Sequence, residues 1–175
     1  MDLKQLIRTI PDFPKAGIQF RDITSLLADP IGFSYVIDQL ALRYKTQGLT
    51  HVAGIESRGF ILGAALAYKL GLGFVPLRKK GKLPGETFSQ EYKLEYGTDV
   101  LEVQKGALSS KDSIVLVDDL MATGGTALGA MALIHQCGAH IIECAVVIDL
   151  PDLGGAKLCA EKGLRVHSMV AFEGD

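Results

Sequence analysis

Short apolar runs alternate with amphipathic stretches through the first half of the chain. Residues 51–55 and 73–77 are short and apolar, as expected of buried strands. Between them, residues 58–70 fit a helix that Gly71 ends. Two strands joined by a helix form a βαβ unit, so we expect these strands to be parallel.

The same alternation continues in the second half. Residues 114–117 and 141–148 are unbroken apolar runs, typical of strands buried on both faces, and a predicted helix over 126–137 separates them and ends at Gly138. Mostly apolar residues recur at every second position over 164–170 and predict a last strand. The chain is therefore predicted to have an α/β fold, a parallel twisted sheet flanked by helices.

The N-terminal part is predicted to be helical. Apolar residues with the i, i+3, i+4, i+7 spacing of an amphipathic helix occupy the start of the chain: Leu3, Leu6, Ile7 and Ile10. Residues 11–14, which include two prolines, break this pattern. A second amphipathic helix is predicted over 33–44 and is ended by Gly48.

The stretch 78–100 has neither pattern. It is polar and contains Gly81, Gly85 and Gly97. A connection longer than roughly 12–15 residues inside a compact domain is usually a lid, a binding element or a disordered segment. We therefore predict that this segment is one of these three.

Length and composition indicate one domain, residues 1–175. A chain of 175 residues is close to the usual domain size of roughly 100–150 residues. No apolar stretch approaches the roughly 20 residues that span a bilayer, so we expect a soluble protein without a membrane partner. The N-terminus lacks the basic start and long apolar region of a secretory signal.

Charge and cysteine content narrow the class further. A net charge of −2 argues against a nucleic-acid-binding protein, which usually has a strongly basic domain. The three cysteines cannot all pair within one chain and form no Cys-x-x-Cys unit, which predicts a reducing, cytoplasmic location. The four histidines are scattered and lack metal-ligand spacing, so no direct protein metal site is predicted.

The candidate chemistry follows the strand at 114–117. Asp118 and Asp119 come next and can accept hydrogen bonds from vicinal hydroxyls, while residues 123–126, Thr-Gly-Gly-Thr, offer backbone N–H groups and hydroxyls to a phosphate at a helix N-terminus. An acidic pair is often a solvated turn, and Gly-Gly-Thr is often a helix start. Both together after a buried strand favour a sugar-phosphate site. A nucleotide-triphosphatase P-loop is excluded because no Lys follows the glycines.

This segment resembles the phosphoribosyl-pyrophosphate (PRPP) signature of type I phosphoribosyltransferases. Further blocks resemble the adenine phosphoribosyltransferase family: PDFP (11–14), GIQFRD (17–22), SRGF (57–60), RKKGKLPG (78–85) and LEYG (94–97). The resemblance implies a reaction of adenine with PRPP that gives AMP and pyrophosphate, Mg²⁺ held mainly by PRPP, and a homodimer. It also implies a small N-terminal hood and a flexible catalytic flap formed by residues 78–100.

The family resemblance assigns roles to residues on the PRPP side. Asp118 and Asp119 would bind the ribose hydroxyls, with Asp118 counted as catalytic. The 5-phosphate would be bound by Ala122, Thr123, Gly124, Gly125 and Thr126. The loop 54–59, which in the family contains a non-proline cis peptide bond, would bind pyrophosphate with the catalytic Arg58. The cations assigned to the same pyrophosphate are Arg78, Lys79 and Lys82, and some of them would act from a partner subunit.

On the purine side, Phe20 and Leu120 would sandwich the ring, and backbone groups up to Arg21 would read the edge of adenine. Glu95 would hold or exchange a proton at N7 as the third catalytic group, with Tyr96 as a further substrate contact. Two alternatives keep the fold: a 6-oxopurine phosphoribosyltransferase, and a regulator that senses PRPP.

Overall fold

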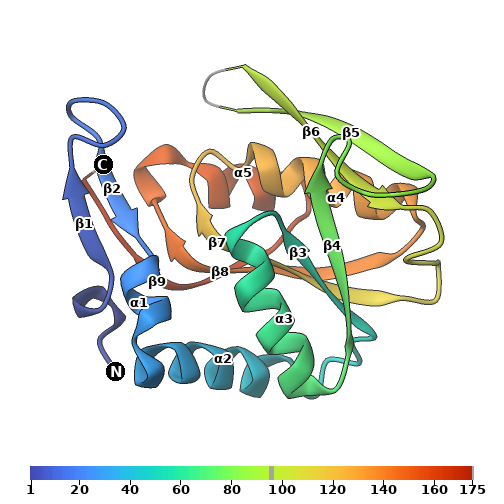
Figure 1. Ribbon diagram of the computed structural model, residues 1–175, viewed down its shortest axis with the longest axis horizontal. Coiled ribbons are helices and arrows are strands. Elements are labelled where there is room, and N and C mark those ends of the chain that lie inside the picture. The colour runs from blue at the N-terminus through green and yellow to red at the C-terminus, as the bar shows by residue number, and fades with distance from the viewer. Residues whose placement is uncertain (95–96, 175) are drawn as a thin grey trace.

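A twisted sheet runs through the centre of the computed structural model (Figure 1), which describes residues 1–94 and 97–174. Within those residues the sheet has seven strands in the order β5-β6-β4-β3-β7-β8-β9. The strands are β3 (His51–Ile55), β4 (Gly73–Lys79), β5 (Thr87–Lys93), β6 (Thr98–Gln104), β7 (Ser113–Met121), β8 (His140–Asp149) and β9 (Val166–Ala171). From β4 to β9 neighbouring strands are parallel, whereas β6 and β5 continue the sheet beyond β4 as an antiparallel pair. The predicted α/β fold is confirmed.

Helices cover both faces of the sheet. The helices α2 (Pro30–Tyr44) and α3 (Arg58–Leu70) pack on one face, and α4 (Gly125–Gln136) and α5 (Gly155–Glu161) pack on the other. Successive strand residues face opposite clusters, as Val52 and Ala53 do in β3. A fully buried Val or Leu contributes about 1.5–3 kcal/mol relative to an exposed one, so the two clusters hold the sheet between its helix layers. Within the described residues, none of the helices is both long and apolar enough to cross a bilayer.

The helix predicted at the N-terminus is wrong. The chain forms a 3₁₀ turn, η1 (Leu3–Gln5), and then a strand, β1 (Arg8–Pro11), which pairs antiparallel with β2 (Gln19–Asp22). Leu3 and Ile7 are buried, which accounts for part of the apolar spacing. Ile10 precedes a proline, which disfavours helical backbone and leaves Ile10 available to pair with the second strand. The β1–β2 hairpin and the short helix α1 (Thr24–Ala28) form the N-terminal hood.

More than half of the described part of the connection over 78–100 is regular, and only 80–86 and the residues next to the β5–β6 turn are not in strands. It contains β5 and the start of β6, which pair from Thr87↔Gln104 to Lys93↔Thr98. Tyr92 of β5 and Leu101 of β6 are buried in the cluster that includes α4. The flap is therefore a two-stranded ribbon attached to the sheet through β4, as the hairpin at the upper edge of Figure 1 shows.

Candidate active site

The predicted site residues gather where the parallel strands end. A cavity of about 400 Å³ lies beside the start of α4. It is lined by Arg58, Leu94, Asp118, Asp119, Leu120, Met121, Ala122, Thr123, Gly124, Gly125, Thr126, Ala127, Cys144 and Val146. A second cavity of about 530 Å³ shares Arg58, Leu94, both aspartates and Thr126 with the first, and adds Glu56, Ser57, Lys79, Lys82, Tyr92 and Asp99. The two adjoining cavities make one cleft, as expected at the carboxyl ends of an open α/β sheet.

Not every predicted residue lines this cleft. Among the described residues, Phe20, Arg21 and Arg78 belong to neither cavity. Glu95 and Tyr96 lie outside the described residues, although Leu94, immediately before them, lines both cavities. The residues predicted to bind the phosphate and the ribose therefore line the cleft, whereas of those predicted to contact the purine only Leu120 does so among the described residues.

The two aspartates lie within β7, because this strand continues to Met121 beyond the predicted end at 117. The Oδ1 atom of Asp118 accepts a hydrogen bond from the backbone N–H of Asp119 at 2.9 Å. Asp119 accepts one from the Nε of Arg58 at 2.5 Å. Burial, followed by the neighbouring charge of Asp119, raises the pKa of Asp118 well above its ordinary value. The pair therefore presents one carboxylate fixed by an arginine and one carboxyl group that binds protons tightly.

The phosphate loop is shaped by two glycines with different constraints. Gly124 has φ of 85°, a left-handed backbone that other residues rarely adopt. Gly125 begins α4, and a Cβ atom on it would collide with the backbone carbonyl oxygen of Lys93 at the end of β5. The helix start is thus packed directly against the flap, with its N–H groups at the cleft.

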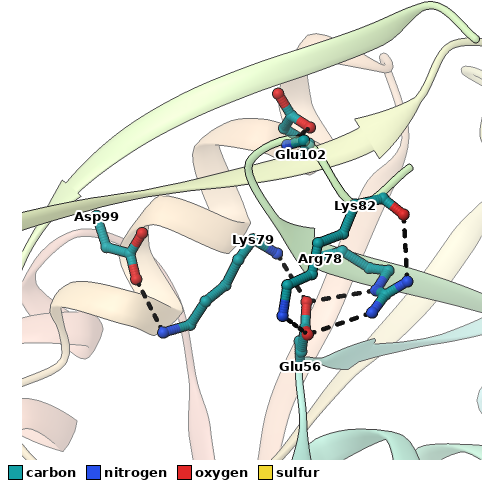
Figure 2. Close-up of polar contacts among 7 residues, drawn as sticks. Glu56, Arg78, Lys79, Lys82, Asp99 and Glu102 are labelled. Atoms are coloured by element: carbon teal, nitrogen blue, oxygen red, sulfur yellow. Dashed lines mark hydrogen bonds and ion pairs between the residues drawn. The ribbon is translucent and has the colours of Figure 1, made fainter. Parts of the chain in front are cut away.

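The loop 54–59, which was predicted to bind pyrophosphate, carries the cis peptide bond that the family resemblance implied, between Glu56 and Ser57. Figure 2 shows the basic residues around this loop. Lys82 donates to the Glu56 carboxylate at 2.7 Å, and Lys79 forms an ion pair with Asp99 at 3.1 Å. Both lysines therefore face carboxylates of their own chain at the cleft.

The hood holds Phe20 and Arg21 through separate contacts. Phe20 packs edge-on against Phe13, with ring centroids 5.1 Å apart. The Arg21 guanidinium lies over the ring of Phe172 at 4.6 Å and donates to Thr9 at 2.8 Å. Leu120 lines the cleft while Phe20 does not, so the purine sandwich stays a prediction.

The sequence analysis gave no role of their own to several residues of the cleft, among them Tyr92, Leu94 and Asp99, and it included Glu56 only as part of the loop 54–59. Burial, followed by the charge of Asp99, raises the pKa of Tyr92 to about 12, so its hydroxyl is neutral at physiological pH. The alternation of residues over 87–93 was a signal of the strand that carries Tyr92 into the cleft. No local pattern marks Glu56 or Asp99, because their partners come from other strands.

Three features meet at one edge of the sheet: a glycine-bearing loop at a helix start, a vicinal acid pair, and a loop with basic residues around it. Together they define a class of protein, the phosphoribosyltransferases. The family model described as the phosphoribosyl transferase domain matches residues 22–165. The adenine phosphoribosyltransferase of Nitrosospira multiformis is 54% identical to this chain over 175 residues, and the alignment covers 100% of both chains. The chain belongs to the adenine phosphoribosyltransferase family.

Solved structures agree with this assignment. The adenine phosphoribosyltransferase of Thermoanaerobacter pseudethanolicus has a TM-score of 0.91 and 46% identity, and the match covers 98% of each chain. The Saccharomyces cerevisiae enzyme, solved with D-2,5-dideoxy-2,5-imino-altritol 1,6-bisphosphate and adenine, has a TM-score of 0.90 and 38% identity, with 97% of each chain covered.

Proposed function

We propose that this protein transfers the phosphoribosyl group of PRPP to adenine, giving AMP and pyrophosphate in purine salvage. The observation that carries the proposal is the continuous cleft in which the aspartates of β7 lead directly into the phosphate loop 122–126. The yeast relative was solved with adenine and a bisphosphate, which are ligands of the same chemical kinds. The whole chain, 1–175, would act as one domain, since η1 and α1 pack into the cluster of α2 and α3.

The reaction breaks the bond between C1′ and the pyrophosphate oxygen and forms the bond from C1′ to N9 of adenine. The N–H groups at the start of α4 would bind the 5-phosphate, and Asp118 would accept hydrogen bonds from ribose hydroxyls. Lys79, Lys82 and Arg58 would neutralise the leaving pyrophosphate. Leu120 would support the purine, and Glu95 would take the N7 proton. In this scheme the cations would lie where negative charge develops on the leaving pyrophosphate, and Glu95 would act where the purine loses its proton.

Mg²⁺ fits the acidic side of the cleft. Two adjacent carboxyl groups raise the pKa of one of them, and a hard cation with its waters would relieve that repulsion. Asp118 and Asp119 are the residues that would face Mg²⁺ carried by PRPP. When bound, the ion supplies charge neutralisation to the pyrophosphate.

The deciding experiment mixes the protein with Mg²⁺, PRPP and each purine base, and measures pyrophosphate and nucleotide formation. We expect kcat/KM for adenine to exceed that for hypoxanthine or guanine by at least about 10²-fold, since a site that reads polar edges rejects mismatched ones. Comparable use of hypoxanthine would favour the 6-oxopurine alternative. Pyrophosphate release with none of the bases would favour the PRPP sensor. A reaction without base measures background hydrolysis.

We also infer a homodimer in the cytoplasm. Ile61 and Tyr68, one face of α3 at i and i+7, are 47% and 90% exposed and offer an apolar surface to a second copy. Cys137, Cys144 and Cys159 are free thiols, which suits a reducing compartment. Sedimentation at assay concentration should give a dimer of the 18.7 kDa chain, and an active monomer would contradict this inference.

Asp118→Asn should lower activity and raise stability. The amide presents one neutral acceptor, so kcat/KM for PRPP should fall roughly 10–150-fold. This factor corresponds to a loss of about 1.5–3 kcal/mol of transition-state binding. The folded-state pKa of Asp118 lies above its unfolded value, so the native state is favoured by protonation and loses stability as pH rises through that window. At pH 7 the variant should therefore be more stable than the wild type, with the gain disappearing in acid.

Urea unfolding at pH 7 and pH 4 measures this difference. Asp112→Asn is the matched control, because hydrogen bonds from Ser109 lower the pKa of Asp112. Its carboxylate stabilises the fold above the unfolded pKa and loses this effect as pH falls, so its replacement should destabilise at pH 7. If both variants changed the free energy of unfolding at pH 7 in the same direction, the raised pKa of Asp118 would be contradicted.

A further inference from the structure

Glu56 links the pyrophosphate loop to the basic segment 78–82. It follows β3 directly, and its side chain is only 9% exposed. Its Oε1 accepts from Lys82 Nζ at 2.7 Å and from Arg78 Nη2 at 3.3 Å. Its Oε2 accepts from the backbone N–H of Lys79 at 2.9 Å and from Arg78 Nε at 3.3 Å. One carboxylate thus receives four donors from one five-residue segment (Figure 2).

The contacts separate the roles of the two cations. All three side-chain nitrogens of Arg78 donate to acceptors in its own chain. Nε and Nη2 donate to Glu56, and Nη1 donates to the carbonyl oxygen of Lys82 at 3.2 Å. Arg78 accordingly lies outside the cleft. Lys82 lines the cleft, and its ammonium group has three donors, of which the contact with Glu56 uses one.

Lysine side chains lose much rotamer entropy when they are fixed, so a lysine ordered before the ligand arrives binds it more tightly. The two cations outnumber the single carboxylate, so the Glu56 cluster keeps a net positive charge for an anion. The ordering of Lys82 and the net positive charge both favour pyrophosphate binding. The negative charge of Glu56 opposes it, because it repels pyrophosphate. Four donors meet the one carboxylate, with the Lys82 contact the shortest at 2.7 Å, so we expect the ordering of Lys82 to outweigh the repulsion.

We propose that Glu56 is a positioning residue that holds the Lys82 ammonium group and the 78–82 turn at the pyrophosphate end of the cleft, with Arg78 bracing the turn. The inference rests on the proposed function, and it changes the role of Arg78 from a pyrophosphate ligand to a support. Glu56 acts through Lys82 rather than by touching the reacting atoms.

The flap supplies a matched control. Glu102 is also buried, and it accepts from the backbone N–H of Gly81 at 2.9 Å and from Ser89 at 3.1 Å. It therefore holds the same turn through neutral donors. Glu102→Gln tests the fold of the turn, whereas Glu56→Gln tests the placement of the cation.

Calorimetric titration with inorganic pyrophosphate and, separately, with AMP measures the effect. Glu56→Gln should raise the Kd for pyrophosphate about tenfold and leave the Kd for AMP within about twofold. Lys82→Met should give a similar loss. The double variant should be no worse than Lys82→Met alone, because both changes remove the same placed ammonium group. Glu102→Gln should leave the Kd for pyrophosphate within about threefold.

Three results would overturn the proposal. Tighter pyrophosphate binding by Glu56→Gln would mean that the carboxylate competes with the ligand. An equal loss of AMP binding would mean that the cleft has collapsed. Additive losses in the double variant would mean that Glu56 acts apart from Lys82. Failure of the proposed function would appear differently, as a wild-type protein that binds neither AMP nor pyrophosphate.

Discussion

Replacing Glu95 by glutamine is expected to lower kcat by about 10²–10⁴-fold, the usual contribution of a general acid or base, with the Kd for PRPP nearly unchanged. Glutamine keeps the size of the side chain and removes the group that would take the N7 proton once adenine is bound. Leu94, the preceding residue, lines both cavities of the cleft.

Steady-state kinetics with adenine and equilibrium binding of Mg²⁺–PRPP separate the two quantities. Glu91→Gln is the control, since Glu91 lies on the same flap and is exposed. A loss near tenfold would indicate positioning of the purine without proton handling. An unchanged kcat would remove Glu95 from the reaction.

Sequence patterns predicted best the parts of the fold that local residues determine. The helix over 58–70 and the strand over 51–55 have their predicted bounds, because Gly71 and the short apolar run mark them within a few residues. That residues 118–126 line one cavity was predictable for a similar reason, since a single strand and the following helix start supply them.

Interactions between distant segments were not predictable in this way. Arg58 and Asp119 are separated by 61 positions and meet only because β3 and β7 are neighbours. The pairing of Glu56 with Lys82 depends on the ends of β3 and β4 in the same manner. The flap strands were missed because polar residues of the outer face alternate with the few apolar residues that pack on α4, so the segment as a whole has a polar composition.

Gly125→Val should lower kcat/KM for PRPP by at least about 10²–10³-fold, because a shift of about 1 Å in a positioned group can alone cost 10²-fold. A Cβ atom at this position would collide with the carbonyl oxygen of Lys93, which is backbone and cannot rotate away. Either the start of α4 or the end of β5 must then move, and both border the cleft. Binding of AMP should weaken as well, since the N–H groups of this turn would bind its phosphate.

Two further variants separate a steric cause in the loop from general damage to α4. Gly125→Ala should be nearly as harmful as valine, because the Cβ atom itself makes the collision. Gly129 lies one turn later, where a Cβ atom would meet the Cβ atom of the buried Tyr92 at 2.6 Å. Gly129→Ala should therefore lower the melting temperature, and because its effect reaches the cleft only through Tyr92, it should weaken AMP binding less than Gly125→Ala does. Wild-type AMP binding by Gly125→Ala would show that the flap does not rest on the phosphate loop in the working protein, and the close packing of Lys93 on Gly125 would then have no part in binding.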